Sequence, residues 1–200
     1  MQVASKRDKS IKTSREEFIE KHDFEYEERI SRKRERQLHQ HGFQFLLSVD
    51  EEEKTNVLWK QNENEELFIF DCEYIVSSSN HSSTVSKRAI YFKFSDKCLY
   101  HFELFPENMV EKLKQFLGNE DIDFDEFPVF SNNYSLRAND KETVILNFPK
   151  ELIEFIGLQK GLNIEGRGNC ILIYLENSDY SDLYEMALSI KEILLRRPIK

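Results

Sequence analysis

The chain has 200 residues, 40% of them hydrophobic, including 16 Phe and 8 Tyr. This is enough apolar material for one globular domain with an appendage, since a typical domain has about 100–150 residues. The 28 basic and 37 acidic residues give a net charge of −9. An acidic body repels phosphate, so nucleic-acid binding is disfavoured.

The N-terminal part differs from the rest in charge and apolar content. Residues 1–13 are polar and basic and are expected to form a mobile tail. Ser14-Arg-Glu-Glu17 matches the capping box, and helix formers continue to His41 before Gly42. Because apolar positions are sparse, we expect one charged, solvated helix over 14–41 that adds little to the core. Residues 42–200 then form a single α+β domain.

A second interpretation of this helix remains open. Residues 1–42 carry 11 Lys+Arg against 9 Asp+Glu, whereas residues 43–200 carry 17 against 28. The segment from Arg29 to Arg36 is therefore a candidate basic arm that contacts an acidic partner or a membrane surface. Glu27, Glu28 and Glu35 lie among these bases and weaken that interpretation.

Next along the chain come several short apolar segments. Gly42–Val49 is a predicted strand, and Gln61–Asn64 is a predicted turn. An antiparallel meander is predicted from three further strands: Leu67–Val76, Ala89–Phe94 and Leu99–Phe105. Their even-numbered positions are apolar, so we expect one core face, with these side chains buried: Phe70, Tyr74, Phe92 and Phe102.

The opposite face of the meander supplies the candidate catalytic residues: Asp71, Glu73, Lys93, His101 and Glu103. Two acids on one strand, with a histidine and an acid on another, are the groups that acid–base hydrolysis uses. Opposite charges facing each other across strands are also ordinary stabilisers of a sheet. The sequence therefore leaves both a catalytic and a structural interpretation of this face.

The second half of the chain alternates helices and strands. We expect helices over residues 106–117, over 141–147 with Asp140 as N-cap, from Phe148-Pro149 to Gly157, and from Leu183 to Arg197. The predicted strands are Asn133–Ala138 and the hairpin Leu162–Glu165 with Cys170–Leu175, which turns at Gly168-Asn169. The predicted fold class is α+β: a mainly antiparallel sheet of about six strands, covered by several helices.

No cofactor or metal site is predicted. From Asp121, a calcium loop would require Gly at the sixth position and Glu at the twelfth, where the chain has Glu126 and Asn132. Gly166-Arg-Gly168 is too short to hold a phosphate and is interpreted as a turn. The three cysteines, Cys72, Cys98 and Cys170, show no CxxC spacing, which disfavours zinc and disulfides.

These features also indicate a compartment. Isolated cysteines within apolar runs suit a reducing environment. The N-terminus lacks the apolar core of a signal peptide, and no apolar run reaches the length of about 18 residues that a membrane span needs. The expected compartment is the cytoplasm.

Several motifs resemble an uncharacterised bacterial family whose members often carry one or two N-terminal membrane helices. They are Phe70-Asp-Cys-Glu-Tyr74, Phe127-Pro-Val-Phe-Ser-Asn-Asn-Tyr-Ser-Leu-Arg-Ala138, Phe148-Pro-Lys-Glu-Leu152 and Glu165-Gly-Arg-Gly168 before Leu172-Ile-Tyr174. The resemblance covers about residues 37–196. It implies no active site, and here a charged helix stands in place of the membrane helix. It suggests a cytosolic face and a possible peripheral contact with a membrane or a membrane protein.

Two functions follow from these observations. The first is a non-enzymatic α+β module that binds an unknown protein partner. The second is a hydrolase-like enzyme that uses the face of Asp71, Glu73, Lys93, His101 and Glu103. The two are distinguished by whether those five side chains come together in space.

Overall fold

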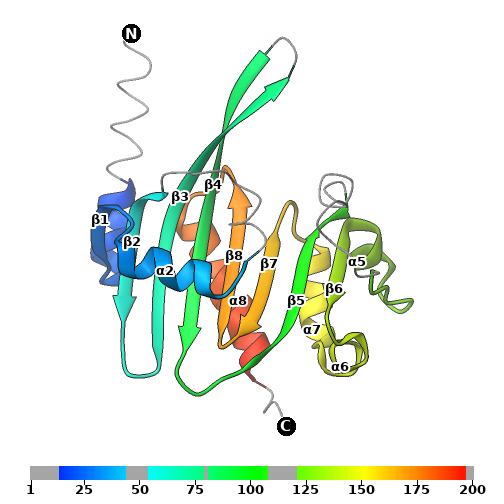
Figure 1. Ribbon diagram of the computed structural model, residues 1–200. Coiled ribbons are helices and arrows are strands. Elements are labelled where there is room, and N and C mark those ends of the chain that lie inside the picture. The colour runs from blue at the N-terminus through cyan, green and yellow to red at the C-terminus, as the bar shows by residue number, and fades with distance from the viewer. Residues whose placement is uncertain (1–13, 44–53, 79–80, 108–120, 197–200) are drawn as a thin grey trace.

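The computed structural model describes residues 14–43, 54–78, 81–107 and 121–196, with backbone only for 73–78 and 81–85. These residues form an eight-stranded antiparallel sheet in the order β1-β2-β3-β4-β8-β7-β5-β6 (Figure 1). The α+β class with an antiparallel sheet is confirmed, but the expected number of about six strands was wrong. The strands are β1 (Glu25–Arg29), β2 (Lys54–Gln61), β3 (Glu65–Ser78), β4 (His81–Phe94), β5 (Leu99–Pro106), β6 (Tyr134–Ala138), β7 (Asn163–Gly168) and β8 (Cys170–Glu176).

The predicted meander is correct for its first two strands only. β3 pairs with β4 from Glu65↔Phe94 to Ser78↔His81. β5 does not continue this arrangement, because β8 pairs with β4 and β7 pairs with β5. The β7–β8 hairpin therefore lies between β4 and β5, and separates them by about three strand spacings, or about 14 Å.

Both faces of the sheet are buried, which differs from the single core face predicted. Phe70, Phe92 and Phe102 are buried as expected. However, Phe70 pairs with Ala89, whereas Phe92 pairs with Leu67. Residues paired across strands share a face, so Phe70 and Phe92 lie on opposite faces. The side chain of Tyr74 is outside the described part.

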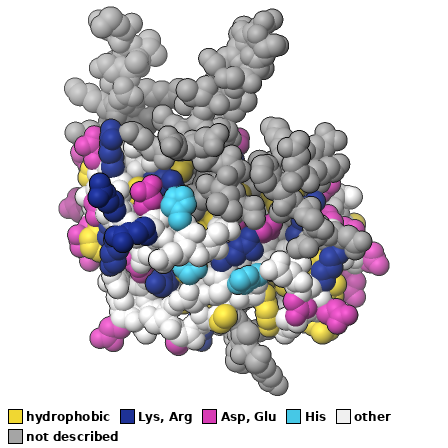
Figure 2. All heavy atoms as spheres, in the orientation of Figure 1, with side chains coloured by type: hydrophobic (Ala, Val, Ile, Leu, Met, Phe, Trp, Pro, Cys, Tyr) yellow, Lys and Arg dark blue, Asp and Glu magenta, His cyan; other side chains and the backbone are white. Residues whose placement is uncertain are grey.

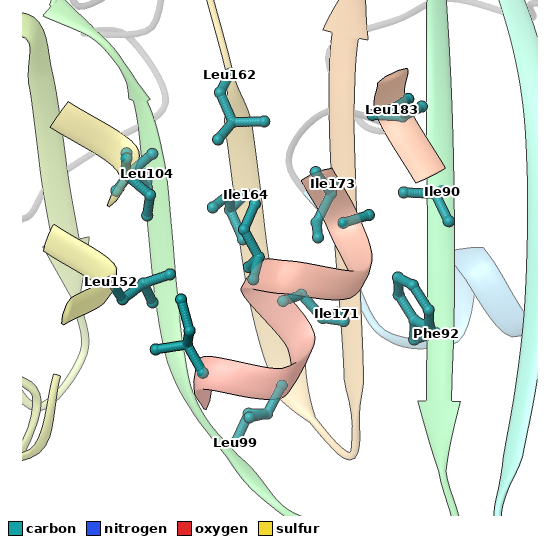
Figure 3. Close-up of a cluster of buried hydrophobic side chains, with 14 of the residues drawn as sticks. Ile90, Phe92, Leu99, Leu104, Leu152, Leu162, Ile164, Ile171, Ile173 and Leu183 are labelled. Atoms are coloured by element: carbon teal, nitrogen blue, oxygen red, sulfur yellow. The ribbon is translucent and has the colours of Figure 1, made fainter. Parts of the chain in front are cut away.

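The larger core lies on the face covered by α8 (Tyr180–Leu195) and α7 (Lys150–Gly157). Figure 3 shows α8 crossing this face, with sheet side chains such as Ile90, Ile171 and Ile173 beneath it. The smaller core lies on the other face, where Leu38 of α2 (Arg32–Gln40) packs with Phe68, Tyr91 and Leu172. α2 crosses this face in Figure 1.

The N-terminal segment is part of the sheet, and the single helix expected over 14–41 was wrong. Residues 14–22 are helical, but β1 follows and pairs with β2 before α2 begins. Phe18 and Phe24 are buried in the larger core, and Leu38 in the smaller one. The expectation that this segment adds little to the core was therefore also wrong.

Local signals in the C-terminal half are confirmed. Asp140 caps α6 (Lys141–Asn147) by accepting a hydrogen bond from the Thr143 N–H at 3.0 Å. β7 and β8 form the predicted hairpin, with Gly168 at φ +58° in its turn. α5 (Pro128–Asn133) was not predicted. The expected strand Gly42–Val49 and the helix over 106–117 fall largely outside the described residues, and Pro106 is the last residue of β5.

Gly166 belongs to strand β7, which corrects its interpretation as part of a turn. It pairs with Phe102 on β5 and Ile171 on β8. A Cβ atom at Gly166 would lie 2.4 Å from the Phe102 ring and 2.9 Å from the Tyr100 carbonyl oxygen. The glycine therefore allows Phe102 to lie flat across β7, where it packs against Phe148 with ring centroids 5.3 Å apart.

Candidate functional site

The five predicted site residues do not come together. Asp71 pairs with Arg88, on the face of the sheet that α8 covers. Lys93 pairs with Glu66 and Cys170, on the α2 face. Glu103 and His101 lie on β5, which is separated from β4 by β8 and β7 in the sheet order. Glu73 is on β3 opposite Ser86, and its side chain is outside the described part.

Asp71 is held in a buried ion pair. The Arg88 guanidinium donates two hydrogen bonds to its carboxylate, at 2.7 Å from Nε and 3.2 Å from Nη2. Asn56 donates a third at 3.1 Å, and Tyr180 a longer one at 3.4 Å. These four hydrogen bonds and the ion pair hold the carboxylate in one orientation. Its role in this arrangement is structural.

The partners of Asp71 are also fixed by burial. Arg88 stacks on the Tyr180 ring at 3.6 Å and donates to the Ser178 carbonyl at 2.7 Å. Desolvation opposes the charge on Arg88, but the hydrogen bonds that Arg88 donates to Asp71 and the negative charge of Asp71 outweigh it and raise the pKa of Arg88. Burial, assisted by the charge of Asp71, raises the pKa of Tyr180 to about 12. Arg88 therefore stays charged and Tyr180 stays neutral at pH 7.

Glu103 is paired with arginine, not with His101. Its carboxylate accepts a hydrogen bond from Arg167 on β7, and the same guanidinium lies 3.7 Å from Glu165. The side chains of Glu103 and Arg167 are both largely buried, whereas His101 is exposed. An ion-paired acid beside an exposed histidine on the same strand does not make a general acid–base pair.

Sequence reasoning missed a cluster around Cys170 on the α2 face. Its sulfur lies 3.0 Å from the Tyr91 hydroxyl and 3.2 Å from His41 Nε2. His41 follows α2 and Cys170 begins β8, and the two are 129 positions apart in the sequence. A contact over this distance is not visible in a local motif. A cysteine beside a histidine is the arrangement that nucleophilic thiols use.

The electrostatics of this cluster do not favour a nucleophile. Burial raises the pKa of the Cys170 thiol to about 11, and it also raises the pKa of Tyr91. Burial, with the nearby charge of Lys93, lowers the pKa of His41. All three groups are therefore neutral at pH 7, and the thiolate that attack requires is scarce.

Thiol reactivity should reflect these environments. In the native protein we expect Cys98, which is exposed, to react with Ellman's reagent, and Cys72 and Cys170, which are buried, to react only after unfolding. Cys98→Ser should therefore remove the fast phase and leave two thiols that react only in denaturant. A fast phase that persists in Cys98→Ser and disappears in Cys170→Ser would instead establish an activated thiol at Cys170.

In the candidate basic arm, Arg29 to Arg36, one of the basic side chains contacts other parts of the molecule. Arg34 is buried, pairs with Glu27 at 2.6 Å and stacks over the Trp59 ring at 4.0 Å. Figure 2 shows this side of the molecule, where Lys and Arg side chains lie interspersed with Asp and Glu. Arg34 is therefore not available to an acidic partner.

The acidic loop after residue 120 also has a structural role. Asp121 Oδ1 accepts hydrogen bonds from the backbone N–H groups of Ile122 and Leu136, at 2.9 and 2.8 Å. Within the described ranges, no three His, Cys, Asp or Glu side chains are arranged to hold a metal ion. In the same ranges, no helix combines the length and the apolar character needed to cross a membrane.

Most of the exposed large apolar side chains of the described residues lie on or just after the helices that follow β5. Within the described part, five large apolar residues are exposed, and four of them lie between α5 and the end of α7: Val129, Ile145, Leu146 and Leu158. Leu146 and Leu158 are 79% and 78% exposed. α5 and α7 are in contact, since Gly157 lies against the Phe130 backbone. In Figure 1 these helices form the β5–β6 end of the molecule.

Comparison with known proteins shows a fold but no family. No family model and no curated protein matches the chain. This chain is similar to a crystal structure of the mycobacterial trehalose monomycolate transport factor A, TtfA, with a TM-score of 0.58. The two share 14% sequence identity, over 94% of this chain and 97% of that one. The chain therefore has the fold of TtfA over nearly its whole length.

Proposed function

We propose that the chain is a non-enzymatic module that binds a protein partner through the outer surface of α5, α6 and α7. The observation that carries this proposal is the concentration of exposed apolar side chains on these helices. Exposed apolar residues are unremarkable when scattered singly, but a group of them marks an interaction site. The fifth exposed apolar residue, Tyr26, lies on β1 at the opposite edge of the sheet.

The surroundings of these side chains resemble the rim of an interface. Lys150 at the start of α7 forms an exposed ion pair with Glu126, and Glu151 forms another with Arg196. Protein interfaces typically combine an apolar centre with a polar, solvated rim. The partner that fits this surface has an apolar patch with charged residues at its edge.

The hydrolase hypothesis has less support. Its two buried acids, Asp71 and Glu103, are each held by an arginine and lie on opposite faces of the sheet. Catalysis by paired acids requires the two groups to converge on one reacting atom. The binding module is therefore the better interpretation of the same residues.

The remaining parts of the proposal concern context. Three free cysteines support a reducing compartment such as the cytoplasm. The net charge of −9 supports a partner other than nucleic acid. TtfA, whose fold the chain shares, is a transport factor. Membership of the uncharacterised bacterial family and contact with a membrane protein stay predictions.

Affinity capture from the native host, with matched bait proteins, tests the proposal. The baits are the unmodified chain, the double variant Leu146→Glu/Leu158→Glu and the control Tyr26→Gln. Because central apolar contacts dominate interface energies, we expect the double variant to retain about tenfold less partner or still less. Tyr26→Gln should retain it fully.

The fold of each bait is verified by circular dichroism, since all three altered residues are exposed. Equal retention of the captured protein by all three baits would place the interface elsewhere and refute the proposed surface. Turnover of an ester or peptide substrate that is abolished by Glu103→Gln would favour the enzyme instead.

A further inference from the structure

The β3–β4 hairpin extends beyond the rest of the sheet. β2 begins at Lys54, opposite Cys72, and β8 ends at Glu176, opposite Lys87. Cys72 and Lys87 pair with each other, so both flanking strands end at the same level. Beyond it, Glu73–Ser78 pairs with His81–Ser86 alone among the described residues. We call these two segments the arm; it is visible projecting from the sheet in Figure 1.

The β4 edge of the arm has backbone groups directed away from β3. The Asn177 N–H donates to the Ser86 carbonyl, and the Phe94 N–H donates to the Asn169 carbonyl. The even-numbered residues of β4 therefore aim their backbone groups toward the side of β8. Past the end of β8, the N–H and C=O groups of Ser82 and Thr84 point to this side, where the described residues provide no strand.

The sequence of the arm lacks the residues that usually protect an exposed strand edge. Charged side chains and proline normally keep such edges from pairing with other chains. Residues 74–86 contain no Asp, Glu, Lys, Arg or Pro, in a chain that is 32% charged. The arm is about 20 Å long, and two strands without a third are only marginally stable in water. A third strand at this edge would stabilise it.

We propose that the β4 edge of the arm pairs with the same edge of a second copy of this chain. When two copies are related by a two-fold axis, their β4 strands run antiparallel, and the same short segment of β4 forms both sides of the contact. Like charges in that segment would repel, and the absence of charge removes this cost for a protein of net charge −9. Cross-strand contacts between Ser and Thr side chains are favourable in antiparallel pairs.

The geometry restricts the register of this contact. Only even-numbered residues of β4 present groups to the edge, so Thr84 faces either Thr84 or its even-numbered neighbour in the other copy. Two residues at position 84 are then directly opposite each other or on a diagonal of about 7–8 Å. A contact between two short strands is small, so we expect a reversible dimer that forms at high protein concentration.

Sedimentation velocity over a wide concentration range tests the proposal on the full chain. We expect the unmodified protein to pass from monomer to dimer, and Thr84→Val, which keeps the N–H and a β-branched side chain, to behave in the same way. Thr84→Lys and Thr84→Glu should each dimerise about fivefold more weakly or worse, because like charges meet across the axis. An equimolar mixture of the two charged variants should recover the dimer.

This contact is independent of the α5–α7 surface, so its failure leaves the proposed protein-binding function standing. A monomer at every concentration would overturn the inference. So would dimerisation that is unchanged in Thr84→Lys, since the interface would then lie elsewhere. A failure of the mixed variants to associate would also refute pairing across a two-fold axis.

Discussion

A chain that begins at residue 37 should lose cooperative folding and aggregate. It would lack β1 and the helix over 14–22, which place Phe18 and Phe24 in the larger core. Removing a buried phenylalanine side chain costs about 3–5 kcal/mol. Two such losses, about 6–10 kcal/mol, approach the whole stability of a domain, which is about 5–15 kcal/mol.

The packing around these two residues supports this magnitude. The Phe18 ring lies 5.5 Å from Phe24, 5.6 Å from Tyr180 and 5.5 Å from Tyr184 on α8. Lys60 of β2 lies over the Phe24 ring and donates to the Tyr184 hydroxyl at 2.8 Å. The deletion would open this aromatic cluster and leave β2 as an unprotected edge strand.

The experiment compares urea unfolding, followed by circular dichroism, for two truncated chains and the full one. A chain that begins at residue 14 is the matched control, because it keeps every contact just described and should unfold like the full chain. Phe18→Ala in the full chain should lower the free energy of unfolding by about 3–5 kcal/mol. A soluble chain from residue 37 with an undiminished, cooperative transition would contradict our account.

The sequence indicated elements whose signals are local. Asp140 caps α6 as predicted, and Gly168 has the positive φ that its hairpin turn requires. β1 carried the opposite signal, because Glu25-Tyr-Glu-Glu-Arg29 is rich in helix formers. Its pairing with β2 overrides that preference, and such pairing is not visible in the segment itself.

Strand order and the face of each side chain were not available from local patterns. Alternation placed Phe70 and Phe92 together, but the register Phe70↔Ala89 separates them. When both faces of a strand are apolar, the alternation no longer shows whether the even-numbered or the odd-numbered side chains point to a given core. The candidate residues were likewise grouped by an assumed neighbourhood of β3, β4 and β5, whereas β8 and β7 lie between β4 and β5. The Cys170–His41 contact depends on the same long-range arrangement.

Arg88→Ala should destabilise the protein by about 3–5 kcal/mol, because it leaves the buried charge of Asp71 without its partner. Both side chains of this pair are nearly inaccessible, at 13% and 11% exposure. The substitution also removes the stacking of the guanidinium on Tyr180 and its hydrogen bond to the Ser178 carbonyl. The loss should appear as a lower urea midpoint with an unchanged slope of the transition.

An exposed ion pair of the same kind is the matched control. Arg196 contacts Glu151 at 3.0 Å, but both side chains are about 60% exposed, at 59% and 61%. Solvent screens such pairs, so Arg196→Ala should change the free energy of unfolding by about 1 kcal/mol or less. Equal effects of the two substitutions would mean that burial does not govern the Asp71–Arg88 pair.

A double variant separates the cost of an unpaired charge from the value of the pair itself. In Arg88→Met/Asp71→Leu no charge is left buried, and apolar side chains fill the volume beneath α8. Replacing a buried ion pair by apolar side chains of similar volume often leaves the stability of the protein unchanged. We therefore expect the double variant to be more stable than Arg88→Ala, although Asn56 and Tyr180 lose an acceptor. If the double variant is instead the less stable of the two, Asp71 contributes through its hydrogen bonds to Asn56 and Tyr180 as much as through its charge.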